Sequence, residues 1–144
     1  MSATAPTAAG KAPGRPAAHP EKMVRAGLRA AMRIFAAWGL DDAAASTLLG
    51  GVGLSTLRRW RRDLEAGRDV KIDVRRDLTD RLSLILGIYK ALQILFPSTA
   101  QADAWVSRTN SNPVFGGRSA LDVMLNGGMD DLYRVRRFLD AQRG

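Results

Sequence analysis

The densest group of chemically active side chains lies between Ser55 and Arg62, where hydroxyl and guanidinium groups surround Trp60. Hydroxyls and the planar guanidinium fork donate hydrogen bonds to phosphate oxygens and to base edges. Leu57, Trp60 and Leu64 are spaced three and four residues apart, so they fit the buried stripe of a helix. We therefore expect DNA contacts from Ser55, Thr56, Arg58, Arg59, Arg61 and Arg62. The alternative is that this run is only a solvated helix face around a buried tryptophan.

The residues before this group have the order expected of a helix-turn-helix. Asp41 is a good N-cap for a helix that runs through Leu49, and small residues at 43–47 allow a second helix to approach closely. A tight turn follows, in which positive φ angles are expected for the glycines Gly50, Gly51 and Gly53. The next helix begins near Leu54 and continues through Leu64. The spacing therefore predicts a DNA-binding helix-turn-helix, with the second helix as the recognition helix.

The side chains that most catalytic and metal sites require are scarce. The chain has no cysteine and a single histidine, His19, which lies in a stretch rich in alanine, proline and glycine. Disulfides, thiolate metal sites and histidine-based catalytic dyads are therefore excluded within one chain. No glycine-rich phosphate loop follows a strand. We expect no catalytic residues, no metal site, no cofactor and no enzymatic activity.

The overall charge favours a polyanionic partner. Lysine and arginine number 22 against 14 acidic residues, which gives a net charge of +8. Charge alone does not distinguish a nucleic acid from an acidic protein. No apolar run approaches the roughly 20 residues that cross a bilayer, and the N-terminus lacks the apolar stretch of a secretory signal. We expect a cytoplasmic protein with no membrane association.

Hydrophobic periodicity predicts an all-α fold in two parts. No segment shows convincing strand-like alternation. Composition and helix signals predict four segments: a disordered tail at 1–20, the helix-turn-helix domain at 21–67, a charged connector at 68–77 and a compact C-terminal helical domain at 78–144. The helices expected outside the 41–64 motif are 21–38, 78–96, 98–107, 118–125 and a last one that Asp130 caps.

The helix at 78–96 has too wide an apolar surface for one buried face. We therefore expect it to be the central helix of the C-terminal half. One interpretation is that two chains dimerise through Leu82, Ile85 and Tyr89 and bind a two-fold-symmetric operator. The other is that the same surface is buried within one chain.

Several C-terminal motifs resemble a known family. The segment begins at Arg81 with RLSLILGIYKALQILFP, and its most specific parts are NPVFGGRS at 112–119, ALDVM at 120–124 and LYRVRRFL at 132–139. These motifs resemble the toxin-binding domain of the Xre-type antitoxins, the group that includes MbcA and ParS. The resemblance closely covers about the last 65 residues, and the expected helix-turn-helix stands where such antitoxins carry theirs.

The resemblance implies a partner and a role. The partner would be a RES-domain toxin, from a family that consumes NAD⁺, and the chain would be its non-catalytic inhibitor. The antitoxin would also repress its own operon by binding operator DNA, as a homodimer within a larger toxin–antitoxin complex. The residues expected to contact the toxin are Phe115, Arg118, Tyr133, Arg136, Arg137, Asp140, Arg143 and Gly144.

Each toxin-binding expectation has a plainer structural alternative. Phe115 and the following glycines also suit the start of a helix, with Ser119 as its cap and Asp122 three residues later. The last residues, through Gly144, would either obstruct a pyrophosphate pocket of the toxin or form a frayed helix end. The whole chain has an alternative as well: a helix-turn-helix transcriptional regulator whose C-terminal half serves only for dimerisation.

Overall fold

The computed structural model describes residues 20–72 and 75–144, and all of the regular secondary structure in these residues is helical apart from one isolated bridge between Thr109 and Ser119. The helices are α2 (Pro20–Ala37), α3 (Asp42–Leu48), α4 (Leu54–Glu65), α5 (Arg76–Leu95), α6 (Thr99–Trp105), the short 3₁₀ helix η4 (Pro113–Phe115), α7 (Ala120–Met124) and α8 (Met129–Gln142). The all-α prediction is confirmed. The tail expected at 1–20 lies, except for Pro20, outside the described residues, as does His19. No helix in the described part of the chain is long and apolar enough to cross a membrane.

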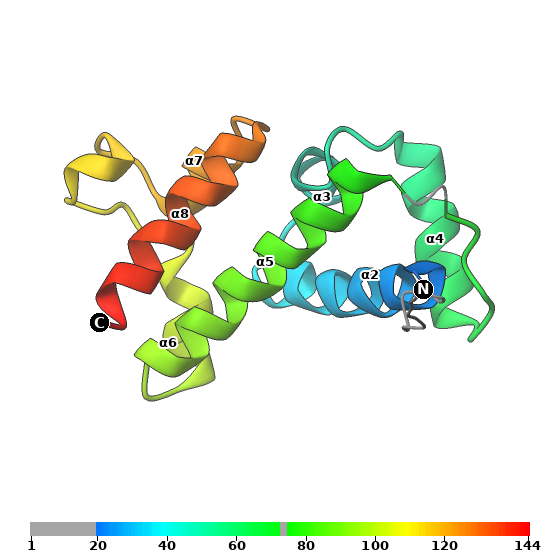
Figure 1. The fold of residues 1–144 in the computed structure, drawn as a ribbon, viewed down its shortest axis with the longest axis horizontal. Helices are drawn as coiled ribbons and strands as arrows, with labels where there is room; N and C mark the ends of the chain where they lie inside the picture. The colour runs from blue at the N-terminus through cyan, green and yellow to red at the C-terminus, as the bar shows by residue number, and fades with distance from the viewer. Residues whose placement is uncertain (1–19, 73–74) are drawn as a thin grey trace, which may run out of the picture.

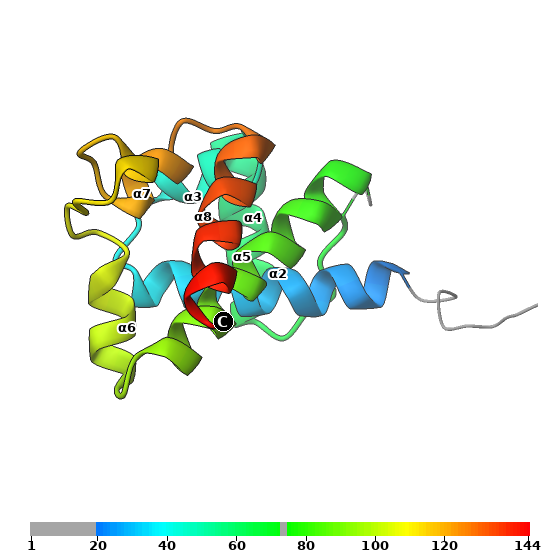
Figure 2. The ribbon, with the colours of Figure 1, turned by 60° about the vertical axis from the view of Figure 1, so that its left-hand side comes forward.

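Helix α5 is the centre of the fold. It runs between the α2–α4 group on one side and the α6–α8 group on the other (Figure 1), and α8 lies along it when the molecule is turned (Figure 2). Leu82 of α5 packs against Gly27 of α2, and Ile85, Ile88 and Leu92 are fully buried. Leu82 and Ile85 are buried within the chain and Tyr89 is half-buried, which favours the second interpretation of this apolar surface.

The helix-turn-helix is built by local capping signals that the sequence contains. The Asp41 carboxylate accepts a hydrogen bond from the Ala44 backbone N–H at 2.8 Å, so the predicted N-cap of α3 is confirmed. Gly50 and Gly51 adopt φ angles of 93° and 87°, which only glycine adopts without strain. Gly53 differs from the expectation, because its φ is −58° and it serves as the N-cap of α4.

The C-terminal helices begin at caps, one of which differs from the prediction. Ser119 and Asp122 form the expected capping box at the start of α7. Asp130 was expected to cap α8, but Gly128 is the N-cap and its N–H donates to the Asp131 carboxylate at 3.1 Å. The helix begins earlier than expected because an aspartate within its first turn, Asp131, can bond back to the backbone N–H of the N-cap residue.

A single buried arginine joins the two halves of the molecule. The Arg81 side chain donates to the carbonyl oxygen of Gly127, in the turn before α8, at 2.8 Å and to that of Leu48, at the end of α3, at 3.4 Å. Its Nε also donates to the Asp77 carboxylate at 3.1 Å. Arg81 is only 7% exposed. One guanidinium group therefore reaches both the end of α3 and, with the shorter bond, the turn before α8.

Candidate functional site

Helix α4 presents a polar stripe that is opposite its buried face. Leu57 and Trp60 are buried, as their spacing predicted. Ser55, Arg59 and Arg62 are all exposed and recur at the four- and three-residue intervals that place them on one side of a helix. Of the six residues predicted to bind DNA, these three form the outward surface that is free to enter a groove.

Two of the other predicted arginines have a structural partner. Asp42, the first residue of α3, accepts from Arg58 Nε at 3.3 Å and from Arg61 Nη2 at 2.9 Å. This carboxylate holds α3 against α4 and partly neutralises both guanidinium groups. Arg58 is still 58% exposed and Arg61 34% exposed, so Arg58 remains accessible beside the outward stripe. The sequence signal for the pairing is weak, because Asp42 lies 16 and 19 residues away.

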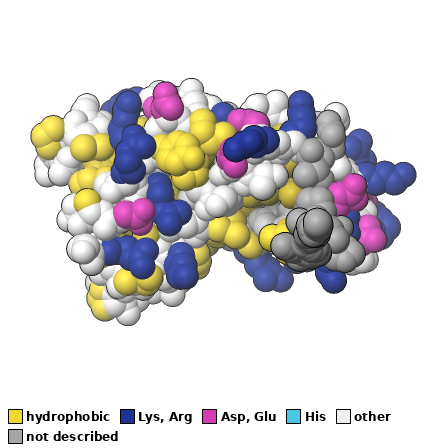
Figure 3. Space-filling view, in the orientation of Figure 1, with side chains coloured by type: hydrophobic (Ala, Val, Ile, Leu, Met, Phe, Trp, Pro, Cys, Tyr) yellow, Lys and Arg dark blue, Asp and Glu magenta, His cyan; other side chains and the backbone are white. Residues whose placement is uncertain are grey.

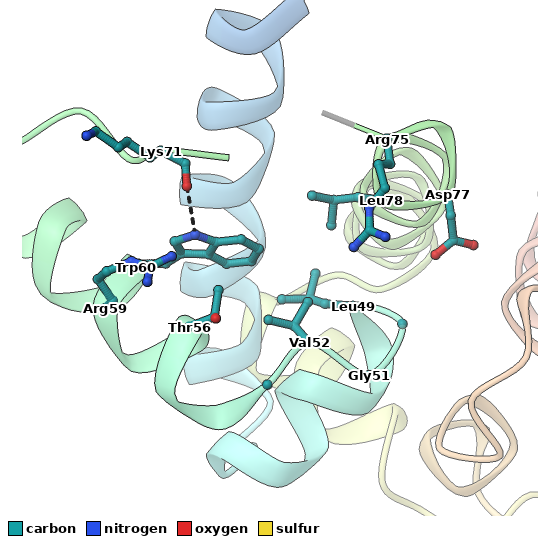
Figure 4. A pocket seen from close by; sticks show the side chains of 12 residues that line it. Leu49, Gly51, Val52, Thr56, Arg59, Trp60, Lys71, Arg75, Asp77 and Leu78 are labelled. Atoms are coloured by element: carbon teal, nitrogen blue, oxygen red, sulfur yellow. Dashed lines mark hydrogen bonds between the residues drawn. The ribbon is translucent and has the colours of Figure 1, made fainter. Parts of the chain in front are cut away.

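Thr56, the remaining predicted DNA contact, is less exposed than the residues of the stripe. It is half-buried and faces a pocket between α4, the glycine turn and the start of α5 (Figure 4). The predicted set therefore divides in space: Ser55 and Arg62 point outward, Arg58 and Arg61 face α3, and Thr56 lines the pocket together with Arg59, which is also exposed on the outward stripe.

Phe115 is a correction to the predicted toxin contacts. Its side chain is fully buried and takes part in an aromatic cluster with Phe138 and Trp105, at ring-centroid distances of 4.9 Å and 5.9 Å. Phe96 extends the cluster on the far side of Trp105. A side chain without exposed surface is unavailable to a partner, so Phe115 anchors η4 to α8 and α6. The toxin contact was implied by the resemblance, and the burial of Phe115 favours the structural alternative instead.

Four of the predicted toxin contacts share one surface. Tyr133, Arg136, Arg137 and Asp140 of α8 line a groove of about 420 Å³ together with residues of α5. Arg137 lies over the Tyr133 ring at 5.8 Å from its centroid, and Arg136 Nε donates to the Asp140 carboxylate at 3.1 Å. The sequence analysis missed the other wall, which is formed by Asp80, Ser83 and Leu84.

Arg136, one of the groove residues, lies against a glycine in α5. A Cβ atom built on Gly87 would stand 1.6 Å from Arg136 Nη1, so the guanidinium lies directly over the glycine backbone. A glycine in the interior of a long helix costs about 1 kcal/mol relative to alanine, which makes a packing reason for it the natural interpretation. Gly87 is therefore the signal that could have identified this part of α5 from the sequence.

The remaining predicted toxin contacts do not line the groove. Arg118 is exposed and precedes α7, and its Nη1 donates to the side chain of Asn126, which follows α7, at 3.3 Å. Arg143 Nη1 lies 3.7 Å from the Asp140 carboxylate, which connects it to the edge of the groove. Gly144 is exposed and follows α8 with a φ of 87°.

The two candidate surfaces lie at different ends of the molecule. Basic side chains gather over the α8 half of the face in Figure 3, around exposed apolar groups, and again beside α4 at the other end. Among the described residues, no group of three or more histidine, cysteine, aspartate or glutamate side chains is arranged to hold a metal. The arrangement fits two macromolecular partners held by one small protein.

Comparisons with known proteins agree with this division. Residues 19–87 match the antitoxin Xre-like helix-turn-helix domain, and residues 91–144 match the antitoxin Xre/MbcA/ParS C-terminal toxin-binding domain. The two matched segments meet within α5. The two matched domains thus define a non-enzymatic, DNA-binding antitoxin of a toxin–antitoxin system.

The chain belongs to the Xre/MbcA/ParS antitoxin family. It is also 46% identical over 121 residues to a protein of Sinorhizobium fredii named "Uncharacterized protein y4oB", across 84% of this chain and 87% of that protein. No solved structure matches the chain. The family prediction made from the C-terminal motifs is confirmed.

Proposed function

We propose that this antitoxin neutralises a RES-domain toxin that consumes NAD⁺ and that it represses its own operon. The resemblance of the C-terminal motifs to the Xre-type antitoxins supports the RES partner. The observation that carries the proposal is the groove between α5 and α8, where four predicted contact residues meet within the matched toxin-binding domain.

The chemistry of the groove suits a protein partner. Tyr133 is 42% exposed and presents an amphipathic ring of the kind that anchors protein interfaces. Arg136 and Arg137 flank it, and arginine forks bind carboxylates and phosphates with two parallel hydrogen bonds. The toxin would therefore place an acidic, partly apolar segment in the groove. Binding there needs no catalytic group from the antitoxin.

The DNA-binding role rests on the outward stripe of α4. Ser55, Arg59 and Arg62 would enter the major groove of the operator, and Arg58 would contact its edge. Two copies of the chain would bind two half-sites as a homodimer, as the DNA-bound forms of many helix-turn-helix proteins do. Since a repressor acts where its operon is, we expect it in the cytoplasm.

A charge reversal on α8 tests the toxin-binding part. Arg137→Glu replaces a groove residue, and Arg134→Glu makes the same change on the same helix at an exposed position that does not line the groove. Each variant is co-expressed with a tagged product of the adjacent gene, and the retained antitoxin is quantified. We expect Arg137→Glu to lose the complex and Arg134→Glu to keep it. Equal retention by both variants would refute the groove as the binding surface.

The toxin class is tested separately. Expression of the adjacent gene alone should lower cellular NAD⁺ and arrest growth, and wild-type antitoxin should restore both. The alternative outcome is that the chain never associates with that gene product, yet dimerises and binds DNA through its helix-turn-helix. It would then be a regulator whose C-terminal half serves dimerisation alone.

A further inference from the structure

The connector between the two halves is fixed against the recognition helix. Val70 is 2% exposed, and the carbonyl oxygen of Lys71 accepts a hydrogen bond from Trp60 Nε1 at 3.2 Å. The sequence analysis had treated this segment only as a charged linker. The backbone at Lys71 is therefore held beside α4 by the same tryptophan that anchors the helix in the core.

This docking completes a pocket of about 390 Å³ on the surface. Thr56 and Arg59 of α4 line it next to Trp60, and Lys71 stands across the indole from them (Figure 4). Gly50 and Gly51 of the turn contribute backbone without side chains, which keeps the pocket open.

The charges around the pocket favour an anion. Within the part of the chain that the structure describes, neither the Lys71 ammonium nor the Arg59 guanidinium forms an ion pair. The one carboxylate in the lining, that of Asp77, is bonded to Arg81 at 3.1 Å. Three basic side chains, those of Arg59, Lys71 and Arg75, and the Thr56 hydroxyl thus line a space large enough for a phosphate group.

We propose that this pocket binds a backbone phosphate of the operator DNA, with Lys71 as a contact from outside the helix-turn-helix. The inference rests on the proposed operator binding and extends it. Arg59 belongs both to the pocket and to the outward stripe of α4, so a duplex that receives the stripe in its major groove brings its sugar–phosphate backbone to the pocket. The Lys71 ammonium supplies a point charge, and the Thr56 hydroxyl donates to a phosphate oxygen.

A salt series tests the assignment. Lys71→Gln removes the charge, Lys71→Arg restores it, and Lys90→Gln is a matched control at an exposed lysine of α5 outside the pocket. Fluorescence anisotropy measures the Kd for two duplexes of equal length, one taken from upstream of the chain's own gene and one of random sequence. A phosphate contact carries no sequence information, so its loss should weaken binding to both.

We expect Lys71→Gln to raise Kd on the order of 3- to 10-fold at low salt and to reduce the slope of log Kd against log salt by about one per bound chain. Lys71→Arg and Lys90→Gln should match the wild type. An unchanged slope for Lys71→Gln would overturn the inference while leaving operator binding intact. Absence of salt-dependent DNA binding by the wild type would overturn both.

A second arm separates the DNA backbone from free phosphate. Inorganic phosphate is titrated into the wild type and Lys71→Gln by calorimetry without DNA. Binding of inorganic phosphate that depends on Lys71, combined with an unchanged DNA salt slope, would contradict the assignment to the operator backbone. A Lys71-dependent DNA slope supports it.

Discussion

Replacing Arg81 with methionine should destabilise the protein more than any other change to an ion pair. Methionine keeps the apolar stem but removes all three hydrogen bonds that the guanidinium makes. The bond to the Gly127 carbonyl at 2.8 Å involves a charged donor, and such bonds contribute about 1.5–3 kcal/mol. The bond to Leu48 at 3.4 Å is too long to add much.

The exposed side of this cluster contributes less. The Asp77 side chain is 60% exposed, so solvent screens its pairing with Arg81, and the pair is worth about 1 kcal/mol or less. The expected loss for Arg81→Met is therefore about 2–4 kcal/mol in the free energy of unfolding. At about 4 °C per kcal/mol for a chain of this size, the melting temperature should fall by roughly 8–16 °C.

Urea unfolding followed by tryptophan fluorescence measures this loss. Asp77→Asn is the matched control, because it removes only the screened ion pair and should cost about 1 kcal/mol or less. If the free energy of unfolding of Arg81→Met lies within about 1 kcal/mol of the wild-type value, the assigned role of the buried bonds is refuted. So would an equal loss in both variants, since the energy would then reside in the exposed pair.

Three further changes test other contacts. Gly87→Ala should hold or raise the free energy of unfolding, by up to about 1 kcal/mol, because alanine has the higher helix propensity. It should also weaken toxin binding, because the new Cβ displaces Arg136. Urea melts and toxin titrations measure the two effects, and lower stability with full toxin affinity would contradict the expectation. Asp42→Asn should cost about 1 kcal/mol or less and tighten binding to random duplex at low salt, because a negative charge beside α4 is lost; weaker binding would show that the carboxylate mainly positions the helix. Phe115→Ala should lose about 3–5 kcal/mol by opening a cavity in the aromatic cluster, and a thermal melt like that of the wild type would contradict its burial.

Local signals explain why much of the fold was predictable. Asp41, Ser119 and the glycine turn act within a few residues of themselves, so their effects can be inferred from spacing alone. The apolar stripe through Leu57 and Trp60 likewise requires only helical periodicity. These features were enough to predict the α3–turn–α4 arrangement. The wide apolar surface of the helix at 78–96 predicted a central helix for the C-terminal half alone, whereas α5 packs against both α2 and α8.

Contacts between distant segments could not be predicted in this way. Arg81 bonds to carbonyl groups 33 and 46 residues away, and backbone carbonyls leave no trace in the sequence. Phe115 was assigned to the toxin for a related reason, because Trp105 and Phe138 enclose it only in the folded chain. The α5 wall of the groove was missed because Asp80, Ser83 and Leu84 meet α8 only in the folded chain.

The central claim is that this chain protects a cell by binding a toxin encoded beside it. The most direct measurement is cellular NAD⁺ and growth when the adjacent gene is expressed with wild-type antitoxin, with Arg137→Glu or without antitoxin. The account predicts NAD⁺ loss and growth arrest without antitoxin, full protection by the wild type and failed protection by Arg137→Glu. Normal NAD⁺ and growth in the absence of the antitoxin would contradict it.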